Sequence, residues 1–186
     1  MGDYLRRLSE SFSRVIKKEL GGIDYPGMVI FWLIIIISVF LVYFIKSRMS
    51  GENRNYFKEV LVILTLMYLV VIAELTVMGR EKMPDRIVRL MLFRSENNLD
   101  DTAADILNFM FFVPWGFLVA LYPEKDRLLR RFGMVFLGSF LISFLVETVQ
   151  YALQIGYFEV IDMKTNIIGG LCGALLSIVL FHSERD

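Results

Sequence analysis

Acidic and amide side chains recur at helical spacing within apolar stretches in the second half of this chain. Glu147, Gln150 and Gln154 occupy positions i, i+3 and i+7, and Asp162 and Asn166 are four residues apart. Each set therefore shares one face of a helix. Carboxylates can act as general bases, and carboxylate and amide oxygens can hold a hard cation or a polar ligand. These two helix faces are the first candidates for a binding or catalytic site.

The sequence around these polar groups is unusually apolar. Of the 186 residues, 56% are hydrophobic, whereas an ordinary soluble domain is about 45–50% apolar. Five segments come close to the roughly 17–25 residues needed to cross a bilayer, and they comprise residues 27–45, 60–78, 106–122, 132–155 and 165–181. The sequence predicts an all-α fold, a polytopic transmembrane helical bundle of five spans.

The residues before the first span have a different pattern. In 1–26, apolar residues recur at three- and four-residue intervals with Arg and Lys between them, which is typical of an amphipathic helix on a membrane surface. The chain thus divides into this helix, a first span with a basic loop at 27–59, and a four-helix domain at 60–181. A second apolar run, 87–93, lies between the second and third spans, and we expect it to form a short interfacial helix.

Charge and cysteine content argue against several classes of protein. Twenty basic residues balance twenty acidic ones, so no nucleic-acid partner is expected. Cys172 is the single cysteine and His182 the single histidine, which argues against a disulfide and against zinc sites of the Cys/His type. We predict no cofactor, and a divalent cation only if the protein is an enzyme.

Hairpin geometry brings the polar groups to one surface of the membrane. Because consecutive spans run in opposite directions, the end of one span lies level with the start of the next. A carboxylate deep in a bilayer costs about 2.5–3.5 kcal/mol, so these groups should face protein or a water-filled cleft. The predicted ligand-binding residues, all near that surface, are Glu74, Asn108, Glu147, Gln150, Asp162 and Asn166.

A plainer interpretation is that such polar groups only tie the helices together, through interhelical hydrogen bonds worth about 0.6 kcal/mol each. We favour it for Ser139, Ser143, Thr148 and Gln154. Glu74 lies close to a helix end, so its side chain could instead extend toward the interface.

Small residues and a proline predict how the helices pack. Gly169 and Gly173 are four residues apart, a spacing that permits close contact between helices, and a homodimer interface is the alternative use of that pattern. Pro114 lacks an amide donor and should kink the third span.

Basic residues favour one orientation in the membrane. The connections at 46–59 and 123–131 each hold four Lys or Arg residues, and the positive-inside rule gives most weight to short basic loops. We therefore expect these loops and the C-terminus in the cytoplasm. The N-terminus and the polar residues then lie at the outer face.

The order of these residues resembles the VanZ-like family of bacterial membrane proteins. The resemblance covers about residues 60–181 and consists of three motifs in sequence. They read Asn108-x-x-x-Phe112-x-Pro114-x-Gly116, then Glu147-x-x-Gln150, then Asp162-x-x-x-Asn166-x-x-Gly169 followed by Gly173. The predicted structural residues are Pro114, Gly116, Gly169 and Gly173.

One region departs from the family's pattern. Many members carry Arg six residues after the motif Gln, where this chain has Gly156, and Asp three residues later, where it has Glu159. If that Arg binds an anionic substrate, this chain either lost the contact or uses a neighbour such as Lys164.

The resemblance implies a multi-pass protein of the bacterial cell membrane, and the family's founding member is associated with low-level resistance to the antibiotic teicoplanin. We therefore expect a non-catalytic envelope protein that binds membrane lipid, a lipid-linked cell-wall precursor or a lipoglycopeptide. The first alternative is an intramembrane enzyme acting on a lipid headgroup, with Glu147 or Asp162 as general base, or as cation ligands together with Asn108 and Asn166. The second is a small transporter gated at the third span.

Overall fold

The computed structural model describes residues 2–20, 57–78, 80–93, 98–122 and 128–182. Within these ranges the chain forms five helices and two short strands. The helices are α1 (Gly2–Leu20), α3 (Phe57–Val77), α4 (Leu99–Ala120), α5 (Leu128–Leu153) and α6 (Val160–His182). The predicted all-α fold class is confirmed. The predicted first span, 27–45, lies outside the described residues.

The helices α3 to α6 are long and apolar enough to cross a membrane. They have 21 to 26 residues each, and at a rise of about 1.5 Å per residue they reach across the roughly 30 Å of bilayer hydrocarbon. Apolar side chains such as Leu137, Leu145 and Leu175 are more than half exposed. A surface of this kind needs lipid around it, and these helices correspond to four of the five predicted spans.

The helices α4 and α6 are in close contact. A Cβ atom on Gly169 would collide with the carbonyl oxygen of Phe109, and one on Gly173 with that of Val113. In lipid the hydrophobic effect does not drive helices together, so van der Waals packing at short range is a main source of attraction between them. Glycine at these positions allows the two backbones to meet.

The third predicted span, α4, is also joined to α3. Tyr68 Oη donates a hydrogen bond of 2.7 Å to the Phe111 carbonyl oxygen, and Ile72 of α3 belongs to a buried cluster with Phe112 and Trp115 of α4. The helix α4 continues through Pro114, which lies on an exposed side. These contacts hold α3 against the α4–α6 pair.

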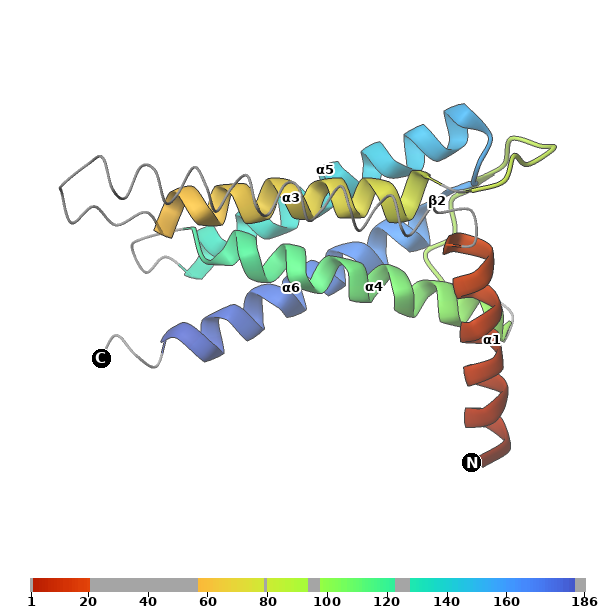
Figure 1. Ribbon diagram of the computed structural model, residues 1–186, viewed down its shortest axis with the longest axis horizontal. Coiled ribbons are helices and arrows are strands. Elements are labelled where there is room, and N and C mark those ends of the chain that lie inside the picture. The colour runs from red at the N-terminus through yellow and green to blue at the C-terminus, as the bar shows by residue number, and fades with distance from the viewer. Residues whose placement is uncertain (1, 21–56, 79, 94–97, 123–127, 183–186) are drawn as a thin grey trace, which may run out of the picture.

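One end of the bundle is crossed by α1, which runs crosswise to the four long helices where α4 begins (Figure 1). Arg14 Nη2 donates to Asp100 Oδ1 at 2.9 Å, and Val15 is buried whereas Leu5 is 59% exposed. The predicted helix is therefore present over 2–20, and part of its surface packs on protein.

The prediction of an interfacial helix at 87–93 is wrong. Instead, β1 (Val88–Arg89) pairs in parallel with β2 (Phe158–Glu159), and the Met83 N–H donates to the Gln154 carbonyl oxygen at 2.6 Å. A helix would form its backbone hydrogen bonds within its own segment. Bonds between the two connections hold the chain extended here and override the local apolar pattern.

The close contact between α4 and α6 predicts that replacing two different glycines with alanine will affect thermal stability differently. Gly173→Ala should lower the temperature of thermal unfolding in detergent micelles, because overpacking a tight interface costs about 1–3 kcal/mol. Gly133→Ala is the matched control, since no described atom lies within 4 Å of a Cβ atom there. It should leave the unfolding temperature unchanged or raise it slightly, because Ala favours helix. Equal effects of the two substitutions would contradict the close contact.

Candidate functional site

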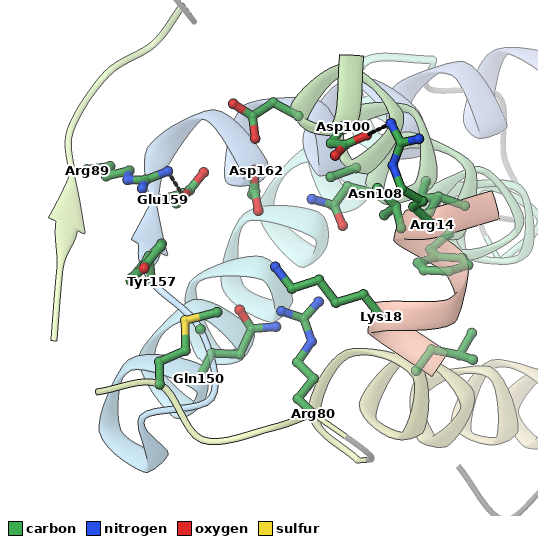
Figure 2. A pocket seen from close by; sticks show the side chains of 18 residues that line it. Arg14, Lys18, Arg80, Arg89, Asp100, Asn108, Gln150, Tyr157, Glu159 and Asp162 are labelled. Atoms are coloured by element: carbon green, nitrogen blue, oxygen red, sulfur yellow. Dashed lines mark hydrogen bonds and ion pairs between the residues drawn. The ribbon is translucent and has the colours of Figure 1, made fainter. Parts of the chain in front are cut away.

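A cavity of about 440 Å³ opens at the end of the bundle that α1 crosses. Its described lining comes from all five described helices, from β1 and β2, and from the segment after α3. Among these residues, the basic ones are Arg14, Lys18, Arg80 and Arg89, and the acidic ones are Asp100, Asp101, Glu159 and Asp162 (Figure 2). The positive and negative charges of the described lining therefore balance.

The lining of the cavity also includes apolar side chains. Val15 of α1, Leu75 of α3, and Leu107 and Phe111 of α4 belong to its lining. Small-molecule sites commonly have cavities of about 300–1,000 Å³ in which a few polar groups are set among apolar ones. The volume and the lining of this cavity fit a ligand with a polar and an apolar part.

The six predicted ligand-binding residues occupy three kinds of position relative to the cavity. Asn108, Gln150 and Asp162 line the cavity. Glu147 and Asn166 are buried, with 2% and 4% of their surface exposed, and are not among its lining residues. Glu74 lies partly exposed near the end of α3, also outside the lining.

The Glu147 carboxylate supports the wall of the cavity. Its Oε2 accepts a hydrogen bond of 2.9 Å from the backbone N–H of Glu159 in β2. The side chain of Glu159 in turn accepts a bond of 2.9 Å from Arg89 in β1. The carboxylate on α5 thus fixes the two strands that close one side of the cavity.

Gln150 links α5 to the end of α3. Its Nε2 donates to the Thr76 backbone carbonyl oxygen at 2.8 Å, and the backbone carbonyl oxygen of Gln150 accepts from the Ile155 N–H at 3.0 Å. A Cβ atom on Gly156 would lie 3.0 Å from Oε1 of Gln150. A larger residue at position 156 would therefore press on Gln150.

Asn166 joins α6 to α5 outside the lining of the cavity. Its Nδ2 donates to Ser143 Oγ at 2.7 Å, an interhelical bond of the kind expected for Ser143. Within the described ranges, Asn166 Oδ1 is buried and has no hydrogen-bond partner. Two of the proposed cation ligands, Glu147 and Asn166, are thus already bonded to other elements. The described residues also contain no group of three His, Cys, Asp or Glu side chains placed to hold a metal ion.

The basic side chains are the part of the site that sequence reasoning missed. Lys164 does not replace the family's arginine, because its Nζ donates to the Leu92 carbonyl oxygen at 3.1 Å and lies 3.9 Å from the centre of the Phe93 ring. Gly156 does line the cavity, and Arg80 lines it too from another part of the chain. Arg80 follows α3 almost directly, so the hairpin argument that placed Glu74 could have found it.

The helices and this cleft define a multi-pass α-helical membrane protein with a polar cavity at one end of its bundle. A scan against protein-family models matches VanZ/LLP1 over residues 30–181. Since the match covers most of the chain, the protein belongs to the VanZ-like family. Comparison with curated proteins gave no match, and neither did comparison with solved structures.

The hydrogen bond to β2 predicts how Glu147 responds to substitution. Glu147→Ala should lower stability to thermal unfolding, because a buried donor left without an acceptor costs about 1–3 kcal/mol. Glu147→Gln should lose less, since its amide oxygen can still accept the Glu159 N–H. Thr148→Ala, at the exposed neighbouring position, serves as control. If Glu147→Ala unfolds at the same temperature as the parent, the carboxylate does not hold the wall.

Proposed function

We propose that this VanZ-like membrane protein binds the polar headgroup of an amphiphile in the cavity at the end of its bundle. The candidates are a membrane lipid, a lipid-linked cell-wall precursor and a lipoglycopeptide of the teicoplanin type. The observation that carries the proposal is the lining itself, which combines charged side chains from α1, α4, α6 and the two connections with apolar ones from α1, α3 and α4. The headgroup would occupy the polar part, and no reaction is required.

The surroundings of the cavity support an amphiphile over a ligand that is soluble in water. The cavity lies at the end of helices whose outer surfaces are apolar, with Leu64 and Leu66 of α3 among the exposed side chains. The acyl chains of a bound molecule could remain against such surfaces while its headgroup enters the cavity. Burial of each CH₂ group of a chain contributes about 0.8 kcal/mol.

The proposed setting is the outer face of the bacterial cell membrane. Its support is the family, together with the basic loops at 46–59 and 123–131, which the positive-inside rule assigns to the cytoplasm. The cavity lies where α4 begins, so the end of α4, where the 123–131 segment follows in the sequence, is directed away from it.

The proposed function can be tested by placing a bulky side chain in the cavity and measuring ligand binding. The purified protein in maltoside micelles would be titrated with teicoplanin, with deacylated teicoplanin and with a lipid-linked cell-wall precursor, and binding measured by calorimetry. The parent should bind at least one acylated ligand. Ala104→Trp, at a lining position, should weaken that binding at least tenfold, equivalent to about 1.4 kcal/mol.

The matched control is Ala73→Trp, on an exposed side of α3 outside the lining, which should bind as the parent does. Expression in a susceptible bacterium supplies a second readout, the inhibitory concentration of teicoplanin. Absence of binding to all three ligands would exclude the precursor and the lipoglycopeptide and leave the membrane lipid, whereas equal loss in the two Trp variants would reject the proposed function.

Orientation is tested by labelling engineered cysteines in intact cells. In a Cys172→Ala background, Ser9→Cys on the exposed side of α1 should react with a membrane-impermeant maleimide added outside. Arg130→Cys, exposed at the start of α5, should react only after the cells are permeabilised. The reverse pattern would put the cavity at the cytoplasmic face.

A further inference from the structure

Two basic side chains reach the middle of the cavity. Figure 2 shows the ammonium end of Lys18 and the guanidinium of Arg80 both pointing into the middle of the cavity. They come from different elements, since Lys18 belongs to α1 and Arg80 follows α3. Arg80 also interacts with neighbouring groups of the protein.

The other two basic side chains are held at the walls by ion pairs. Arg14 Nη2 lies 2.9 Å from Asp100 Oδ1, and Arg89 Nη1 lies 2.9 Å from Glu159 Oε1. Each of these pairs joins elements that are far apart in the sequence. They build the walls, whereas the cationic groups of Lys18 and Arg80 reach the middle (Figure 2).

An anion alone does not match the whole lining. Asp162 of α6 lies beside these two cationic groups, and its carboxylate points toward the middle of the cavity (Figure 2). A second anion held close to a carboxylate is repelled, whereas an ammonium group there is attracted. Asn108 reaches the same region from α4 and offers an amide that can donate to a phosphate oxygen (Figure 2).

We infer that the cavity takes a headgroup carrying one phosphate and one amine, with the phosphate between Lys18 and Arg80 and the amine at Asp162. This inference rests on the proposed function and names the chemistry of its ligand. Arginine and lysine are the usual cationic partners of phosphate, and the balanced charge of the described lining matches a zwitterionic group. The headgroup could belong to a membrane lipid or to a free phosphodiester, and the test separates the two.

The experiment measures three affinities for the full chain in maltoside micelles. The probes are dioctanoyl phosphatidylethanolamine, dioctanoyl phosphatidylglycerol, which has the phosphodiester without the amine, and free glycerophosphoethanolamine. The parent should bind the ethanolamine lipid at least tenfold more tightly than the glycerol lipid. Equal binding of the free headgroup would identify a soluble phosphodiester as the ligand, and much weaker binding would identify a lipid; either supports the charge assignment.

Substitutions at three positions separate the two ends of the headgroup. Lys18→Ala, at an exposed position of α1, should weaken both lipids by a similar factor of about ten while the parent's preference remains. Asp162→Asn should abolish the preference for ethanolamine over glycerol. Arg80→Lys keeps the charge and should bind more tightly than Arg80→Gln.

The controls remove like charges outside the lining. Lys17→Ala on the same helix and Asp85→Asn in the connection after α3 are both exposed, and neither should change any affinity. The inference is overturned if the parent binds the two lipids equally, or if Lys18→Ala changes neither affinity. The inference can fail while the parent still binds a teicoplanin-type ligand and Ala104→Trp still weakens that binding. The proposed function then stands, but the headgroup is not recognised by its phosphate and amine.

Discussion

The contact between α4 and α6 is the constraint on which the rest of this structure depends. Lipid is as apolar as the helix surfaces, so these helices are held by contacts that require their backbones to approach. Gly169 and Gly173 provide that approach against the carbonyl oxygens of Phe109 and Val113. The contact also sets the register of the two helices. Asn108, one residue before Phe109, and Asp162, two turns before Gly169, consequently arrive at the same cavity.

A set of hydrogen bonds between the connections and α5 also stabilises the structure. Two connections that are far apart in the sequence pair through β1 and β2, and Glu147 anchors β2 to α5 by accepting the Glu159 N–H. Extended backbone has unpaired donors and acceptors, which are costly beside hydrocarbon. The β1–β2 pairing gives some of these backbone groups hydrogen-bond partners. It also holds Arg89 and Glu159 where they form the cavity wall.

The sequence was informative about the membrane spans and about which membrane surface the polar groups lie near. Hydropathy and hairpin geometry are local or nearly local properties, so a sequence can reveal them. It predicted that Asn108, Gln150 and Asp162 would lie near one surface, and all three line the cavity. It could not show that Lys18 turns inward, because an amphipathic pattern does not distinguish a face on protein from a face on lipid. The pairing of Arg89 with Glu159 joins residues 70 positions apart, and no spacing rule predicts such a contact.

The charge balance of the described lining has a kinetic consequence. With four basic and four acidic side chains among the described lining residues, their field largely cancels beyond the Debye length, which is about 8 Å at physiological ionic strength. Such a cavity does not draw ions from the medium by long-range steering, which needs an excess of one sign. An amphiphile would reach it by lateral diffusion in the leaflet. Its abundance in the membrane, and not in the surrounding water, would then set how often the cavity is occupied.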